Sequence, residues 1–600
     1  MRRIYFLYVW LCLLQTPLFS QIKWDGGGGD GRWSTAANWS NDVLPTALDD
    51  VVLDNTFIYG NYSIEADAVI SIGSLSIQPA VNHNIILVLP ATNTAVPAFT
   101  VNNIIIDNGG VLRNASGADN GQPLVITDSL RINNGGRFIQ NTERSHAALV
   151  TALSRAPGTE EGIFEFDLPG ASNTISLSGR YFGKLVLSSN AMPGIVNYTA
   201  TGTNGITIRS DLEVGEGVTL SMNMSDTLFI HRDLVQQGGT INLGNSNRIL
   251  TTVIGRHLLQ SSTGSILKTG TAIPEIIMQG SVPQVIDCQG NIQNQIVFTI
   301  NNANGVTLNN NLSLPFLLQL KKGILNTSLV NLLTLLPGCR IQADSLSAAS
   351  YINGPVRAAI ESFTSHYLLP VGKGNTMGWL ALKNAYGHFT AEYFNSDPHL
   401  FSDSNGTGIN HISSGEYWTI EADEFPLPSA QVELAFKAGS SITVTDMNHL
   451  RIASLQNEIW TNAGNTAYTG TAGSQGSVTS EQIDGWNDGP TYFTLASTMP
   501  AGSLSLRDNH PVSLNRLNYA PLRIVSISSS GILTCQSPEK SLLTIRVTSI
   551  NGTLVQSSTV YVDKGTNTIN MNLKDIPAGV YCIQAFLGKR PSNILKYLKL

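Results

Sequence analysis

The chain has 600 residues, of which 42% are hydrophobic and only 13% are charged, and its formal net charge is −7. This charge offers no basic field for nucleic acid, so we expect no nucleic-acid partner. Glycine is frequent, at 55 residues, and the abundance of Asn, Ser and Thr favours strands and turns over helices. A chain of this length is expected to contain about four domain-sized units.

The amino terminus has the layout of a secretory signal peptide. Two arginines precede an apolar run from Ile4 to Leu14, and the small residue Ser20 stands before Gln21. We therefore predict that residues 1–20 are cleaved during export. The apolar run is too short to span a bilayer, and no later segment has the roughly 18 uncharged apolar residues of a transmembrane helix. The mature chain is thus expected to have no transmembrane segment.

Residues 21–50 form a stretch rich in Trp and Gly ahead of the first predicted strand. Trp24, Trp33 and Trp39 alternate with glycine and turn-forming residues. Indole rings over a glycine-rich loop can cover the open edge of an elongated β structure, so we predict an N-terminal cap. In the alternative interpretation, Trp24 and Trp33 are exposed and contact sugar.

Residues 51–345 repeat a phrase in which a strand leads through polar residues into a glycine, after which a second strand begins. The first glycines of five such phrases are Gly109, Gly135, Gly217, Gly238 and Gly323. Each is expected to adopt a left-handed backbone conformation that other residues reach only with strain. Their successive separations are 26, 82, 21 and 85 residues, and the long ones are near four times the short ones. A repeat of about 20–26 residues lies in the range of solenoid coils. We predict an all-β chain that begins with a right-handed parallel β-helix.

Two features of this region bear on function. Residues 142–162 include a short helix-favouring stretch, predicted to be an insertion on the solenoid surface. The charged residues Arg209, Asp211, Arg232 and Asp233 are candidates to converge across adjacent coils. A polysaccharide lyase or glycosidase needs paired carboxylates, or a carboxylate with a basic residue, in such a place. Surface solubility and pairing at strand ends explain the same residues.

Residues 346–498 contain short alternating strands separated by Gly, Asn and Ser, which indicates a β-sandwich module. The segments "INGPVR", "LLPVGKG", "SGEYW" and "FTLAS" resemble a module of large surface proteins exported by the bacterial type IX secretion system. Residues 499–520 lack clear alternation and are predicted to be a linker.

Residues 521–600 contain seven short predicted strands, which indicates an immunoglobulin-like sandwich. The segments "INGTLV", "KGTNTINMNLKDIPAGVYCIQAF" and "LKYLKL" resemble the type A C-terminal sorting domain of type IX cargo in Gram-negative bacteria. The resemblance implies recognition by the secretion machinery at the outer membrane, after passage through the periplasm. The positions that match the family pattern, and so carry the sorting signal, are Gly552, Gly565, Gly579, Tyr581, Lys596 and Lys599.

Cysteines and short acceptor motifs add smaller predictions. Cys535 and Cys582 lie in the same predicted domain, where they either form a disulfide or remain separate thiols. Ser129, Thr227 and Ser345 stand in Asp-Ser/Thr-Leu motifs that resemble O-glycosylation acceptors of these bacteria. Ordinary turn chemistry explains the same motifs.

No nucleotide, redox or metallohydrolase motif occurs in the sequence, so we expect no cofactor and no metal. The combined features predict a secreted or cell-surface protein that acts as an adhesin-like or scaffolding protein. Its expected partners are the type IX machinery and a surface, host or extracellular glycan. The alternative is a polysaccharide lyase or glycosidase that acts on a β-helix face.

Overall fold

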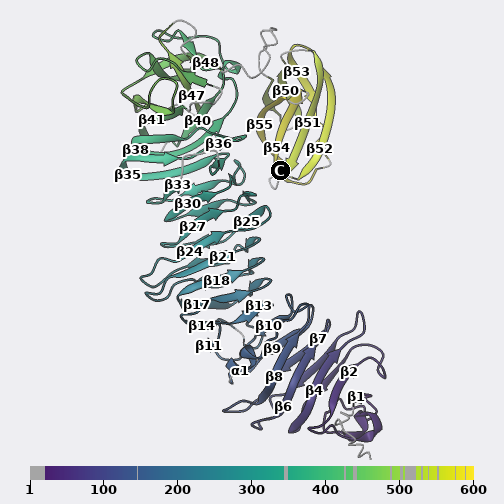
Figure 1. Cartoon of the computed structure of the whole chain (residues 1–600). Helices are drawn as coiled ribbons and strands as arrows, with labels where there is room; N and C mark the ends of the chain where they lie inside the picture. Colours follow the sequence, from purple (N-terminus) through teal and green to yellow (C-terminus); the bar gives the residue numbers. More distant parts are fainter. Residues whose placement is uncertain are drawn as a thin grey trace, which may run out of the picture. The chain divides into compact units, whose positions relative to one another are not determined.

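The computed structural model in Figure 1 is almost entirely β-structure, with one α-helix, α1 (Ala147–Thr151), in the part of the chain that it describes. The predicted signal peptide and most of the predicted linker lie outside that part. The described residues are 21–144, 146–192, 194–343, 349–423, 427–436, 442–486, 489–499, 504–506, 522–528, 531–537, 540–549, 553–574, 576–587 and 590–599.

The chain divides into two compact units, which are described separately. The first comprises the residues up to Gly255 together with Leu259–Pro274, and the second comprises Arg256–Leu258 and Glu275–Leu600. Parallel coils occur in both units, so the prediction of a parallel β-helix is confirmed.

The first coils of the first unit are built from two parallel sheets, and from β2 onward successive strands alternate between them (Figure 1). Each coil therefore contributes one strand to each sheet. One sheet contains β1 (Gln21–Lys23), β2 (Asp50–Asp54), β4 (Ile70–Gln78), β6 (Phe99–Ile106) and β8 (Leu124–Ile132), and the other contains β3 (Tyr62–Glu65), β5 (Ile85–Leu89), β7 (Gly110–Asn114) and β9 (Arg137–Gln140).

After α1 the coil changes shape, because each turn now contributes three short strands to three sheets. The strands up to residue 267, sheet by sheet, are β10 (Ile163–Phe166), β13 (Lys184–Leu187), β16 (Leu212–Val214), β19 (Leu234–Gln236) and β22 (Leu258–Gln260); β11 (Ser172–Ile175), β14 (Val196–Gly202), β17 (Val218–Met224), β20 (Thr240–Asn242) and β23 (Ser265–Leu267); and β12 (Tyr181–Phe182), β15 (Ile206–Ile208), β18 (Asp226–Ile230) and β21 (Leu250–Ile254).

The second unit begins with coils of the same kind and then changes from parallel to antiparallel pairing at β35 (Val356–Leu369). β35 pairs in parallel with β32 through Val356–Ala358 and in antiparallel fashion with the next long strand. The coil strands are β24 (Glu275–Met278), β27 (Val297–Asn301), β30 (Leu317–Lys322) and β33 (Arg340–Ala343); β25 (Gln284–Cys288), β28 (Val306–Leu308), β31 (Leu325–Asn326) and β34 (Ile352–Asn353); and β26 (Asn291–Ile292), β29 (Leu312–Leu314) and β32 (Leu333–Leu335).

The interior of the coils is apolar because alternate side chains of every strand point inward. In β17, Val218, Leu220, Met222 and Met224 are all buried, and the residues between them are half-buried. Burying each such side chain contributes about 1.5–3 kcal/mol. Stacking many short strands therefore gives the solenoid a continuous core, although no single coil has a core of its own.

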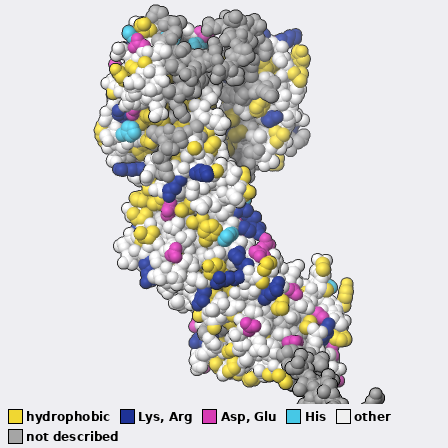
Figure 2. Space-filling view, viewed as in Figure 1, with side chains coloured by type: hydrophobic (Ala, Val, Ile, Leu, Met, Phe, Trp, Pro, Cys, Tyr) yellow, Lys and Arg dark blue, Asp and Glu magenta, His cyan; other side chains and the backbone are white. Residues whose placement is uncertain are grey.

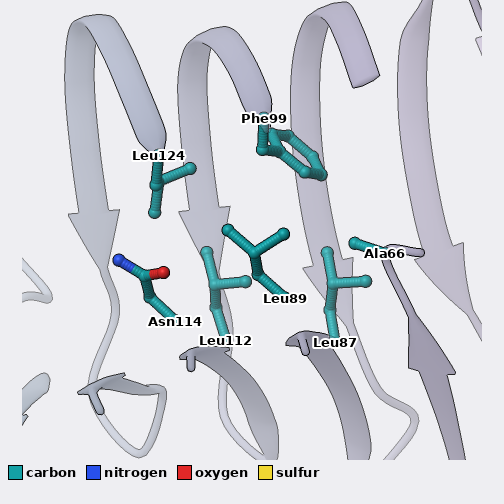
Figure 3. Close-up of a pocket in the computed structure, with 7 residues that line it drawn as sticks. All are labelled: Ala66, Leu87, Leu89, Phe99, Leu112, Asn114 and Leu124. Atoms are coloured by element: carbon teal, nitrogen blue, oxygen red, sulfur yellow. The ribbon is translucent and has the colours of Figure 1, made fainter. Parts of the chain in front are cut away.

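Figure 3 shows this packing in the two-sheet coils, where Leu87, Leu89, Phe99, Leu112 and Leu124 meet. The space between these side chains does not admit a water molecule.

One polar side chain, Asn114, lies in the same layer, and its amide donates to Gln140 Oε1 of the next coil at 3.2 Å. Because a buried amide is costly without a hydrogen bond, such pairs favour one register between neighbouring coils.

Four of the five predicted turn glycines have positive φ: Gly109 (+81°), Gly135 (+84°), Gly217 (+69°) and Gly323 (+88°). The prediction for Gly238 is wrong, since the left-handed residue is its neighbour Gly239 (+65°). The reason is the turn register. β6, β8 and β16 are each followed by two residues before the left-handed glycine, and the same spacing after β19 selects Gly239.

An antiparallel module follows the solenoid coils, built around the long strand β38 (Leu380–Phe394). One edge of β38 pairs with β35, and the other pairs with two strands that diverge from it. The first branch contains β41 (Ser429–Phe436), β46 (Gly476–Ile483) and β45 (Ala467–Thr469), and the second contains β40 (Tyr417–Ala422), β47 (Thr491–Ser497), β43 (Leu450–Gln456) and β44 (Ile459–Gly464). All these strands belong to one hydrogen-bonded sheet, which divides into the two branches at β38.

A buried carboxyl group lies in the core of this module. Glu416 is 3% exposed, and its Oε2 accepts a hydrogen bond from the Tyr393 hydroxyl at 2.8 Å. Burial raises the pKa of Glu416 from 4.5 to about 7, and the Tyr393 hydrogen bond opposes this shift only in part. The folded module therefore holds a proton at pH values where the unfolded chain has released it.

We expect the module to lose stability as the pH rises from 4.5 through 7, by about 3 kcal/mol in total. Urea unfolding of the module at pH 5 and pH 8 measures this loss. Glu416→Gln keeps an acceptor for Tyr393 but cannot ionise, so the variant should lack this pH dependence. An equal pH dependence in the variant would contradict the assignment.

The C-terminal residues form two further antiparallel sheets, which fit a β-sandwich. One contains β49 (Arg523–Ile527), β50 (Ile532–Ser537) and β53 (Gly565–Asn570), and the other contains β52 (Leu554–Val562), β51 (Ser541–Ser549), β54 (Gly579–Leu587) and β55 (Arg590–Lys599). Strands of both sheets contribute to one buried core, which includes Leu533, Cys535, Ile545 and Ile583.

Candidate functional site

The last strand of the chain, β55, is held by its lysine side chain as well as by pairing. The Lys599 ammonium donates to the backbone carbonyls of Leu573 and Lys574, each at 2.6 Å, and also to that of Ile576. It thus fixes the segment before β54 to the end of the sheet. Lys596, on the same strand, is exposed.

The other predicted sorting positions that the structure describes are turn and core residues. Tyr581 is buried, and its hydroxyl donates to the Pro577 carbonyl at 2.7 Å. Gly565 opens β53 with φ +105°, and Gly579 opens β54 opposite Lys599. Gly552 lies outside the described residues.

Comparison with known families agrees with this geometry. Residues 527–594 match the family described as secretion system C-terminal sorting domain. A search of curated proteins gives no match for the chain. The matched domain marks the chain as cargo of the type IX secretion system, so it interacts with that machinery and is exported to the cell surface or the extracellular space.

Lys599 and Lys596 differ in their contacts, which gives a matched pair of variants. Lys599→Met leaves three carbonyls without their charged donor, and we expect it to lower the unfolding free energy of the sorting domain by about 2–3 kcal/mol. Lys596→Met removes an exposed charge and should cost less than about 0.5 kcal/mol. Chemical unfolding of the two variants measures the difference in unfolding free energy. Equal losses would show that the hydrogen bonds of Lys599 do not stabilise the domain.

Of the two alternatives left open for Cys535 and Cys582, the structure has the separate thiols. Cys535 and Cys582 are both free thiols. Cys535 points into the core, and burial raises the pKa of its thiol. Cys582 alternates with the inward residues Tyr581 and Ile583 of β54, so its side chain lies on the other face of that sheet. The two sulfur atoms are therefore on opposite sides of the sheet that contains β54, because alternate side chains of a strand lie on opposite faces.

The four charged residues proposed as an enzyme site are brought together only in part. Arg232 Nε lies 3.7 Å from Asp211 Oδ1, and the same oxygen accepts from the Asp233 amide at 3.0 Å. Asp233 itself is buried. Arg209 points elsewhere, since its guanidinium donates to both the carbonyl and the hydroxyl of Thr159 at 2.7 Å.

Both arginines hold the loop that follows α1. Arg232 forms an ion pair with Glu161, and Arg209 approaches Glu160 at 3.9 Å as well as bonding Thr159. Burial lowers the pKa of Arg209, and Glu160 opposes this effect. The arrangement fastens the predicted insertion to the coil surface.

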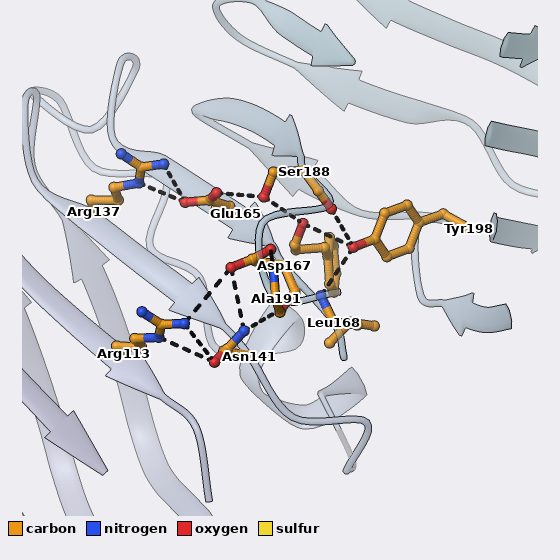
Figure 4. A network of polar contacts seen from close by, with 10 residues as sticks. Arg113, Arg137, Asn141, Glu165, Asp167, Leu168, Ser188, Ala191 and Tyr198 are labelled. Atoms are coloured by element: carbon orange, nitrogen blue, oxygen red, sulfur yellow. Dashed lines mark hydrogen bonds and ion pairs between the residues drawn. The ribbon is translucent and has the colours of Figure 1, made fainter. Parts of the chain in front are cut away.

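A second charged network, which the sequence did not predict, lies where the coil changes from two sheets to three (Figure 4). Glu165 is 1% exposed, pairs with Arg137 Nε at 2.6 Å and accepts from the Ser188 hydroxyl at 2.6 Å. Asp167 is 4% exposed and accepts from the Ala191 amide at 2.8 Å.

Tyr198 completes this network by linking three backbone positions. Its hydroxyl donates toward the carbonyls of Ser188 (2.7 Å) and Phe166 (3.2 Å) and accepts from the Leu168 amide at 3.0 Å. Such satisfied buried groups favour one arrangement of the junction. Because the partners come from neighbouring coils, their spacing in the sequence shows no motif.

The sugar-contact interpretation of Trp24 and Trp33 is wrong. Both indoles are buried, at 2% and 3% exposure. They pack edge-to-face on Trp39 at 4.9 and 4.5 Å, and Trp33 also packs on Phe99 at 5.5 Å. Rings buried in this way present no face to a sugar, and their burial beside the first coils agrees with a capping role.

The two predicted glycosylation acceptors that the structure describes, Ser129 and Thr227, are both half-buried. Ser129 is half-buried and donates to Asn103 Oδ1 at 2.7 Å. Thr227 is half-buried on β18. Ser345 lies outside the described residues. Modification of these residues stays a prediction.

Metal ligands and membrane-spanning helices were further possibilities for the described residues. The described residues contain no group of three or more His, Cys, Asp and Glu side chains suited to a metal ion. They also contain no helix that is long and apolar enough to cross a membrane. Figure 2 shows that neutral side chains and backbone dominate the visible surface, with charged side chains scattered over it.

Proposed function

We propose that this cargo protein is an adhesin-like binding protein, which the sorting domain delivers to the cell surface and whose solenoid and antiparallel module contact a glycan. The observation that carries the proposal is a sorting domain at the end of a long chain of stacked coils. Solenoids offer extended surfaces suited to binding.

The charged clusters of the solenoid support a binding role over a catalytic one. Arg209 and Arg232 are engaged by the insertion, and Glu165 and Asp167 are buried in ion pairs and hydrogen bonds. Residues used in this way stabilise the coil junction and are not free to transfer protons.

The experiment that tests the proposal compares binding with turnover. The chain from Gln21 is incubated with a panel of polysaccharides, and both retention on the polymer and release of reducing ends are measured. We expect retention without release. Release that is lost in Asp211→Asn or Asp233→Asn would establish the lyase or glycosidase alternative instead.

A further inference from the structure

The antiparallel module contains a cavity of about 350 Å³ where its two branches separate. Residues of β43, β44, β46 and β47 and the turn after β46 line it. Its volume lies within the range of about 300–1,000 Å³ usual for small-ligand sites. We propose that this cavity binds one or two units of an uncharged oligosaccharide, an inference that rests on the proposed function and gives it a site.

The chemistry of the wall excludes most other ligand classes. The carboxylates of Glu481 and Asp484 reach the cavity, and none of the described residues that line it is Lys, Arg or His. A phosphate, sulfate or uronate would therefore face negative charge without a counter-ion. An apolar ligand would displace water from the polar side chains of the wall and leave them without hydrogen bonds. Six lining side chains are neutral and polar: Ser454, Gln456, Thr461, Asn462, Gln482 and Thr491.

Some side chains of the wall form hydrogen bonds within the module, and others have none among the described residues and are available to a ligand. The Thr461 hydroxyl donates to the Ser454 carbonyl at 2.9 Å, and the Gln482 amide donates to the Ser429 hydroxyl at 2.7 Å. Within the described part of the chain, the Gln456 amide and the Glu481 carboxylate have no hydrogen-bond or ion-pair partner. An amide offers donors and an acceptor, and a carboxylate offers acceptors. Sugar hydroxyls, which both donate and accept, complement this pair.

Trp486 supplies a flat apolar surface at the same cavity. Its Nε1–H donates to the Ile483 carbonyl at 3.1 Å, and its ring packs against Phe389 and Phe493 at 5.3 and 6.0 Å. These contacts fix the orientation of a ring that is only half-buried. A pre-oriented indole provides contact area at little entropic cost, and the C–H face of a sugar ring is its natural partner.

The test uses the whole chain from Gln21 and a panel of neutral tetrasaccharides from glucan, mannan, galactan and xylan, with an oligouronate as the charged probe. Affinities are measured for the wild type, Gln456→Ala, Trp486→Ala and the control Tyr468→Ala, an exposed aromatic on β45 outside the cavity. Thermal melting of each variant monitors folding. Gln456 is exposed, so its variant stays informative if Trp486→Ala unfolds the module.

We expect a neutral tetrasaccharide to bind, with affinity reduced at least tenfold in Gln456→Ala and Trp486→Ala and unchanged in Tyr468→Ala. Equal binding by all variants, binding of the oligouronate alone, or no binding at all would overturn the cavity assignment. None of these results overturns the adhesin-like function, which is tested separately by polysaccharide turnover and by the dependence of cell attachment on the chain.

Discussion

Deleting residues 522–600 is expected to abolish display at the cell surface while the rest of the chain is still made. The deletion removes the region that matches the sorting family and with it the contact with the type IX machinery. Surface labelling of intact cells, compared with total protein in lysed cells, measures the displayed fraction. We expect this fraction to fall to background.

A point substitution tests whether the sorting domain must be folded for display, or whether its sequence alone is sufficient. Ile545 is fully buried in the core of the domain, so Ile545→Asp should unfold it and reproduce the deletion. Thr559→Asp on the exposed face of β52 is the control and should be displayed. Normal display of Ile545→Asp would show that an unfolded tail is sufficient for export.

The Gly323→Ala variant is expected to lose about 2–5 kcal/mol of unfolding free energy in the solenoid coils. Gly323 has φ +88°, and an added Cβ would lie 1.7 Å from the Asn302 carbonyl oxygen of the neighbouring coil. The left-handed backbone costs an Ala about 1–2 kcal/mol, and forcing the coils apart adds about 1–3 kcal/mol.

Gly338 provides the matched control, because it has φ +84° but no atom within 4 Å of the position of an added Cβ. Gly338→Ala should therefore cost only the backbone part, about 1–2 kcal/mol. Urea unfolding of both variants measures the difference. Equal losses would mean that the close approach of the coils does not constrain position 323.

Much of the architecture could be predicted because it rests on local signals. The strand–glycine phrases predict coils, since a left-handed turn needs glycine, and Gly109, Gly135 and Gly217 have this role. The left-handed glycine predicted at Gly238 is one residue off, because the repeat alone does not give the end of the preceding strand. The "INGTLV" and "LKYLKL" segments are also local signals, since each is contiguous in the sequence, and they identified the sorting domain.

The contacts between coils and layers could not be predicted in this way. Glu165 pairs with Arg137, which is 28 residues earlier in the chain, and Arg232 reaches Glu161 across 71 residues. The cavity near Trp486 depends on where two branches leave β38. These features follow from register, which a single sequence does not show.

Attachment of cells to a glycan-coated surface measures whether the displayed chain binds glycan. Three strains are compared: the wild type, a strain lacking the chain, and the same strain carrying the chain without residues 522–600. We predict that only the wild type attaches strongly, because both the binding regions and the sorting domain are needed. Equal attachment by the strain that lacks the chain would contradict it.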